Sequence, residues 1–166
     1  MHLKFIAPAV VCLLISGCGP APEPGPVAPG PAPSPWSTLV TGAGTGLAYT
    51  PTSPSIATPP LRLTCALGEF RVSVGKLVPI PSEDRLSIGF DSEPFALAVT
   101  PESLTAAEGI EATGPLTSEL LTGMASAKTI SGSYGAKQFG PYDAPPAKTL
   151  SAFVAGCRAA SSPAPR

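Results

Sequence analysis

Histidine is nearly absent from this chain. The 166 residues include one histidine, His2, and only 13% of positions are charged and 6% aromatic. Because His2 lies in an N-terminal segment that we expect to be cleaved, the mature chain has no histidine for a Ser-His-Asp or Cys-His catalytic centre. The same lack excludes histidine-containing zinc sites, and the two cysteines that we expect to remain in the folded part are too few to close a structural zinc site. The sequence therefore predicts neither a metal nor a cofactor.

The chain also has no excess of basic charge. It carries 10 Lys and Arg against 11 Asp and Glu, for a formal net charge of −1. A protein that binds nucleic acid through its phosphates needs a clustered basic face, so we expect no nucleic-acid partner. Gly42-Ala43-Gly44-Thr45-Gly46 is rich in glycine but lacks the Lys-Ser/Thr ending of a phosphate-binding loop, and we interpret it as a flexible loop.

The pattern of the N-terminal residues indicates a targeting segment. Lys4 is followed by the uncharged, mostly apolar run from Phe5 to Gly17. Thirteen helical residues cover about 20 Å, which is short of the roughly 30 Å hydrocarbon core of a bilayer. We therefore interpret residues 1–17 as a cleaved signal peptide rather than a membrane span.

The run ends in Ile15-Ser16-Gly17-Cys18, which resembles the lipobox of bacterial lipoproteins. The resemblance implies cleavage before Cys18, with lipid such as palmitate on its thiol and amine and a membrane-anchored protein facing the periplasm. Gly19 in place of Asp favours the outer over the inner membrane in that class. An ordinary secretory signal with an incidental cysteine is the alternative, for which Gly19-Pro20 is a poor cleavage site.

A proline-rich linker follows, at residues 18–35. Eight of the 17 residues from Gly19 to Pro35 are proline, so the segment is expected to stay extended and to reach roughly 50 Å. We interpret it as a tether, with a polyproline ligand for a partner as the alternative. Residues 36–158 are predicted to form one globular domain, and residues 159–166 a disordered tail.

Hydrophobic periodicity predicts an α+β fold. Apolar residues alternate with polar ones over residues 61–67, 70–74, 85–90 and 95–99, and residues 36–41, 46–50, 110–113 and 129–134 are further candidate strands. Residues 116–125 and 147–158 have helical spacing, and a shorter turn is expected to begin at Thr100. We predict an antiparallel sheet of about five to seven strands with one or two helices on its apolar face.

Cys65 and Cys157 are predicted to form a disulfide. Cys65 lies on the leucine face of its strand, and Cys157 lies on the apolar stripe of the last helix, so both point at one core. In an oxidising compartment the bond would join the C-terminal helix to the sheet. The alternative is a pair of buried free thiols.

Two sets of residues are candidates for function. Glu83-Asp84 and Asp91/Glu93 flank one predicted strand and are interpreted as turn formers or, alternatively, as the carboxylates of a hydrolase. Tyr134, Lys137, Phe139 and Tyr142 gather in one segment as a possible partner-binding loop. The alternative is that Tyr134 and Phe139 pack under the last helix while Tyr142 anchors a turn.

The sequence favours a non-enzymatic function. We expect a lipid-anchored periplasmic protein of the cell envelope that serves as a binding or structural module for an envelope protein partner. An accessory lipoprotein of a secretion system is one alternative, and a carboxylate-dependent hydrolase or an enzyme inhibitor is another. The sequence makes no prediction of the oligomeric state.

Overall fold

The computed structural model describes residues 34–41, 44–53, 55, 57–105 and 109–161. All of these belong to one compact unit, Pro33–Arg166. Cys18, its lipobox and most of the proline-rich linker therefore lie outside the described residues, and their roles stay predictions.

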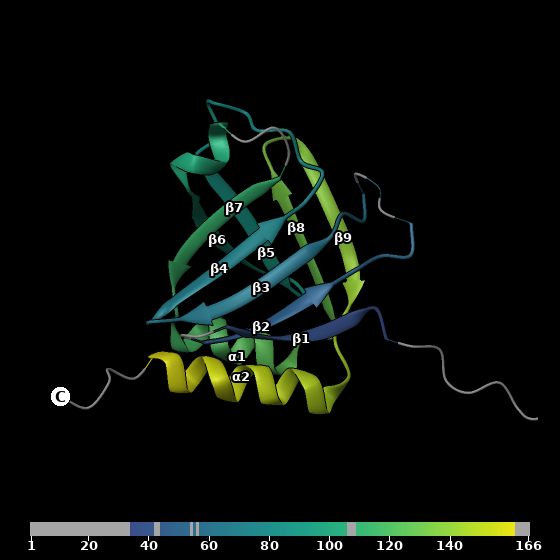
Figure 1. The fold of residues 1–166 in the computed structure, drawn as a ribbon, viewed down its shortest axis with the longest axis vertical. Helices are drawn as coiled ribbons and strands as arrows, with labels where there is room; N and C mark the ends of the chain where they lie inside the picture. Colours follow the sequence, from purple (N-terminus) through teal and green to yellow (C-terminus); the bar gives the residue numbers. More distant parts are fainter. Residues whose placement is uncertain (1–33, 42–43, 54, 56, 106–108, 162–166) are drawn as a thin grey trace, which may run out of the picture. The chain divides into compact units, whose positions relative to one another are not determined.

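The domain is built on one antiparallel sheet (Figure 1). Its nine strands are β1 Trp36–Thr41, β2 Gly44–Tyr49, β3 Leu61–Ala66, β4 Glu69–Val74, β5 Arg85–Phe90, β6 Glu93–Val99, β7 Ile110–Pro115, β8 Thr129–Tyr134 and β9 Lys137–Asp143. They lie in the order β1-β2-β3-β4-β7-β6-β5-β8-β9. The helices are the short η1 Pro101–Thr105, α1 Ser118–Ser126 and α2 Ala147–Ser161. None of the described helices is both long and apolar enough to cross a membrane.

The inner face of the sheet carries the core. On β3, β4 and β5 every second residue is buried, as the two-residue hydrophobic period predicts. Large side chains fill the interior, with Phe70 and Phe90 6.3 Å apart between ring centroids and Phe153 buried on α2. α1 and α2 close one end of the curled sheet (Figure 1), and α2 packs on β2, β3 and α1.

The predicted disulfide is present. Cys65 on β3 and Cys157 on α2 are fully buried, with their Cα atoms 5.1 Å apart, and the bond spans 92 residues of sequence. It joins the C-terminal helix to the sheet, so the prediction is confirmed.

The sheet curls until its first and last strands meet at one corner. The indole Nε1 of Trp36 on β1 donates to the carbonyl of Asp143 on β9 over 2.7 Å. The rings of Tyr49 and Tyr142 lie 4.6 Å apart at the same corner, and the Tyr142 hydroxyl donates to the carbonyl of Pro59 over 3.0 Å. These contacts hold the β2–β3 connection against β9.

The sheet is larger than predicted. β9 was expected to be a loop, and β2 begins at Gly44 although Gly42–Gly46 was expected to be flexible. Glycine and proline obscure the strand pattern in both places.

The helix boundaries also differ from the prediction. The helix predicted over residues 116–125 starts later, because Pro115 ends β7 and α1 begins after its N-cap Thr117, whose hydroxyl accepts from the Leu120 N–H. Residues 159–161, expected in the tail, form the last turn of α2.

Candidate functional site

The aromatic segment singled out in the sequence belongs to the core. Tyr134, Phe139 and Tyr142 are each only 1% exposed, while Lys137 lies exposed in the β8–β9 hairpin. Burial raises the pKa of Tyr142 above its ordinary value. The three rings therefore form no surface patch, and the prediction of an aromatic partner-binding loop is wrong as far as its rings are concerned.

The alternative interpretation, core packing, holds in outline but not in its detail. The Tyr134 hydroxyl accepts from the N–H of Ile80 over 2.9 Å and is also within 3.0 Å of the Ile80 carbonyl. The hydroxyl therefore fixes the loop between β4 and β5. Tyr142 anchors the β2–β3 connection through Pro59.

The flanking carboxylates do not converge. Glu83 and Asp84 precede β5, whereas Asp91 and Glu93 follow it, and six extended residues separate them by about 20 Å. A pair of catalytic carboxylates in a glycosidase lies roughly 5–10 Å apart. These two pairs therefore cannot act together on one bond.

Asp91 has a structural role at its end of β5. Its Oδ1 accepts from the backbone N–H groups of Lys128 and Thr129, each over 2.9 Å, and lies 3.2 Å from the Thr129 hydroxyl. The backbone hydrogen bond from Thr129 has the largest effect, followed by that from Lys128, and together they hold the pKa of this exposed carboxyl below its usual value. Asp91 thus ties the β5–β6 turn to the start of β8.

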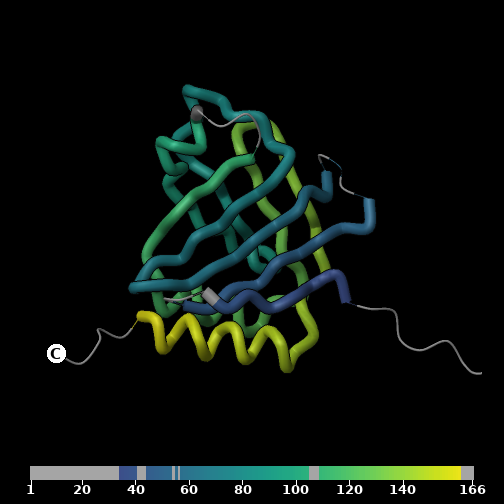
Figure 2. Tube along the Cα trace, viewed as in Figure 1, coloured from purple at the N-terminus to yellow at the C-terminus, as the bar shows by residue number. Residues whose placement is uncertain are grey.

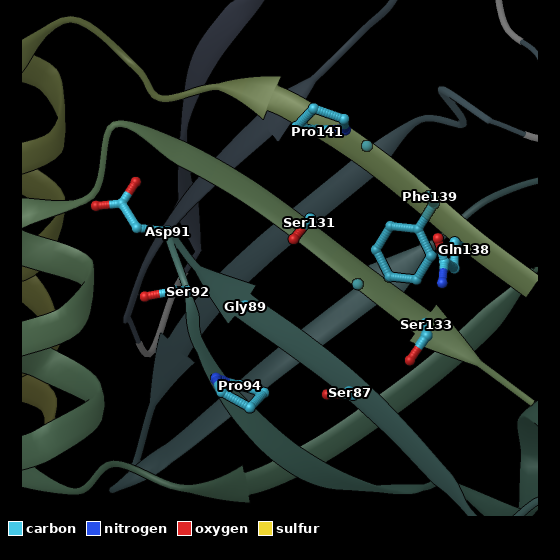
Figure 3. Close-up of a pocket in the computed structure, with 12 residues that line it drawn as sticks. Ser87, Gly89, Asp91, Ser92, Pro94, Ser131, Ser133, Gln138, Phe139 and Pro141 are labelled. Atoms are coloured by element: carbon cyan, nitrogen blue, oxygen red, sulfur yellow. The ribbon is translucent and has the colours of Figure 1, made fainter.

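A groove of about 320 Å³ lies on the outer face of β5, β6, β8 and β9. Ser87 and Gly89 come from β5, and Ser131 and Ser133 come from β8. Figure 3 shows these serines on neighbouring strands, with Pro94 of β6 on one side of them and Pro141 of β9 on the other. The groove therefore has a floor of small residues between two proline rims.

Strand register sets the positions of the polar groups. Ser87 lies directly opposite Ser133, which in turn lies opposite Gln138, so three polar side chains form one row across β5, β8 and β9. One row along, Ser131 lies opposite Gly89. Such outward-facing cross-strand pairs place their side chains about 5 Å apart.

The hydroxyl groups of the groove serines make no hydrogen bond to any described residue, and neither does the side-chain amide of Gln138. Every fully buried side-chain nitrogen or oxygen of the described residues has a partner. The unpaired groups are therefore those that solvent reaches, and they are free to donate to and accept from a ligand.

A β-bulge shapes the β9 side of the groove. Ile130 pairs with Tyr142 and Gly132 with Phe139, so Gly140 and Pro141 together face Ser131 alone. Gly140 has φ of +85°, a conformation that glycine adopts without a steric penalty. Gly132 leaves room for the Phe139 ring, which a Cβ at this position would strike. Bulges of this kind often lie beside functional sites because they redirect side chains.

The groove is almost uncharged. Among the described residues that line it, Asp91, at one end, is the only ionisable one. The outer face of β4 and β7 contrasts with it, since Arg71 pairs there with Glu111 over 2.7 Å and Ser73 donates to the same carboxylate over 3.2 Å. A charged ligand would find no partner on the serine rows.

The polar side chains of the groove are hydroxyls, one amide and one carboxylate. A serine nucleophile needs an adjacent base, and no histidine is present among the groove residues. No group of three or more histidine, cysteine or acidic residues in the described part of the chain is placed to hold a metal ion. What the groove offers is hydrogen bonding by side-chain hydroxyl and amide groups.

Sequence reasoning missed this site. Ser87, Ser131 and Ser133 are the outward-facing residues of correctly predicted strands, and serine alone carries no chemical signal. The available signal was the run of small uncharged residues at neighbouring outward positions, Ser87 and Gly89 of β5 and Ser131 and Ser133 of β8. No family model, curated protein or solved structure matches this chain.

Proposed function

We propose that this protein is a lipid-anchored component of the bacterial cell envelope whose domain is a non-enzymatic binding module. The groove on β5, β6, β8 and β9 is its binding surface. The observation that carries this proposal is the row of unpaired polar side chains formed by Ser87, Ser133 and Gln138. A periplasmic domain on a proline-rich tether is well placed to reach a ligand held near the membrane.

The groove chemistry supports a neutral ligand rich in hydroxyl and amide groups. Serine hydroxyls both donate and accept, and the Gln138 amide adds two donors and an acceptor. The absence of cations from the lining disfavours phosphate and carboxylate ligands. A glycan that carries acetamido groups, which is the chemistry of a bacterial cell-wall polymer, satisfies both conditions.

The filled interior of the domain and the separation of its two carboxylate pairs support a binding function over hydrolysis. The interior is filled by rings such as Phe70, Phe90 and Phe153, so a ligand would bind at the surface, where the serine-lined groove is one of several concave regions. The two carboxylate pairs lie at opposite ends of β5, and Asp91 is committed to backbone N–H groups.

Binding of chitotetraose, a neutral oligosaccharide with acetamido groups, tests the proposal by titration calorimetry. We expect Ser133→Lys to abolish binding, because a long charged side chain would occupy the middle of the row. Ser82→Lys is the matched control, since Ser82 is exposed in the β4–β5 loop outside the groove. Equal affinities of the two variants, or no binding by the wild type, would contradict the proposal.

The lipid anchor is tested separately by metabolic labelling with palmitate. We expect the wild-type protein to be labelled and Cys18→Ala to be unlabelled, because the lipobox resemblance assigns the lipid to Cys18. An unlabelled wild type, or a label that persists in Cys18→Ala, would refute the anchor and leave the groove proposal intact.

A further inference from the structure

The outer edge of β1 has unused backbone hydrogen-bonding groups. β1 has one neighbour in the sheet, β2, and the Thr50 N–H donates to the Pro35 carbonyl at the start of their ladder over 3.0 Å. Antiparallel strands alternate, so Ser37 and Leu39 bond to β2 while Thr38 and Val40 direct their N–H and C=O groups away from it. No other element among the described residues bonds to these groups of Thr38 and Val40.

β1 lacks the features that usually protect an edge strand. Its sequence, Trp-Ser-Thr-Leu-Val-Thr, contains neither a charge nor a proline. The opposite edge of the sheet, β9, contains charged residues and a proline, namely Lys137, Asp143 and Pro141. It also has a bulge, at which the Gly140 N–H donates to the Ala57 carbonyl. Only one of the two edges is therefore open to a further strand.

Apolar side chains accompany this free edge. Val40 is 96% exposed, the largest exposure among the big hydrophobic side chains of the described residues. It pairs across the ladder with Thr45, which Gly156 of α2 approaches closely. Around Gly156 on the helix, Ala152, Ala155 and Ala159 are all exposed. The strand edge therefore carries an exposed valine, and the side of α2 next to β2 carries small exposed side chains.

We propose that β1 pairs antiparallel with β1 of a second copy of this chain. In the register that uses only the free groups, Thr38 of each copy lies opposite Val40 of the other, and Leu39 faces Leu39 on a two-fold axis. Four backbone hydrogen bonds form, two at each Thr38–Val40 pair. Trp36 stays outside the pairing, because its backbone N–H already donates to the Ser34 hydroxyl over 3.3 Å.

A second copy suits this edge because the strand is complementary to itself. An uncharged strand places no like charges opposite one another when it pairs across a two-fold axis. Figure 2 shows β1 and α2 running in the same direction, so the α2 helices of two paired copies would run antiparallel. Their exposed alanines permit close approach, and Leu39 and Val40 both lose contact with water.

Sedimentation equilibrium at rising concentration tests the dimer, using residues 18–166 with Cys18→Ser so that no lipid is attached. We expect a monomer–dimer equilibrium, and a dissociation constant raised about tenfold or more by Val40→Lys, which brings two like charges to the interface. Val78→Lys is the matched control, because Val78 is 71% exposed outside β1. A wild type that stays monomeric, or a control that dissociates equally, would overturn the proposal.

Disulfide trapping tests the register. Leu39 faces its own copy across a non-hydrogen-bonded position, where Cα atoms lie about 4.5 Å apart, within the range that a disulfide bridges. We expect Leu39→Cys to give a covalent dimer on mild oxidation. The two Ser37 positions would lie about 13 Å apart, so Ser37→Cys should not. Equal crosslinking of both variants, or none of Leu39→Cys, would overturn the proposed pairing.

Discussion

Removing the disulfide between Cys65 and Cys157 should destabilise the domain strongly. The perturbation is the double substitution Cys65→Ala and Cys157→Ala, which leaves neither a free thiol nor a buried hydroxyl. Both cysteines are fully buried, one on β3 and the other on α2. Without the bond, α2 is held to the sheet by packing alone, although the native contacts of its other apolar residues remain.

The magnitude follows from the length of chain that the bond closes. A sequence separation of 92 residues corresponds to about 4–5 kcal/mol of lost chain entropy in the unfolded state. Small domains have total stabilities of about 5–15 kcal/mol, so the bond supplies a large share. For a domain of this size we expect the melting temperature to fall by roughly 15 °C.

Urea denaturation at 25 °C, followed by circular dichroism, measures this effect directly. Wild-type protein unfolded in the presence of a thiol reductant is the control, since reduction breaks the bond without changing a side chain. We expect reductant to destabilise the wild type and to leave the double variant unchanged. If the double variant loses less than about 1 kcal/mol of unfolding free energy, the bond does not stabilise the domain by constraining the unfolded chain.

Three further substitutions test contacts elsewhere in the domain. Gly132→Ala should cost about 1–3 kcal/mol of unfolding free energy, because its Cβ would strike the Phe139 ring; an unchanged denaturation midpoint would refute that packing. Tyr142→Phe should cost about 1–2 kcal/mol by leaving the Pro59 carbonyl unpaired, and equal stability in urea would show that the bond contributes nothing. The lowered pKa of Asp91 means that its contribution is present above its unfolded pKa, near 3.8, and is lost as the pH falls through its lower folded pKa. Asp91→Asn should therefore flatten the acid limb of the stability profile, and identical wild-type and variant slopes below pH 3.8 would contradict that role.

Much of the fold was predictable because buried strands leave a two-residue period. Over β3, β4 and β5 the apolar residues that alternate in the sequence are the residues buried in the structure. Cys65 and Cys157 followed from the same pattern, since each lies on an apolar face and both faces meet in one core. Local periodicity is sufficient where one face of an element is buried.

β9 shows where that reasoning fails. The bulge at Gly140 and Pro141 inserts an extra residue, so Phe139 and Tyr142 both point inward although three positions separate them. This spacing breaks the alternation that identifies a strand. The same irregularity made Phe139 and Tyr142 resemble an exposed loop, whereas tertiary packing places them in the core.

The groove could not be predicted because it depends on long-range register. Ser87 and Ser133 are 46 positions apart in the sequence and become neighbours only when β5 pairs with β8. Neither serine has a catalytic motif around it. What identifies the site is a shared outward face with unpaired polar atoms, and that is a property of the folded sheet.

The most direct test of the proposed binding function is a map of backbone amide chemical shifts during titration with chitotetraose. We predict that the shifted amides cluster on β5, β8 and β9, centred on Ser87, Ser133 and Gln138, and that the amides of β3 and β4 on the other half of the sheet stay in place. An unchanged spectrum, or shifts centred away from these serine rows, would contradict the assignment of the groove as the binding surface.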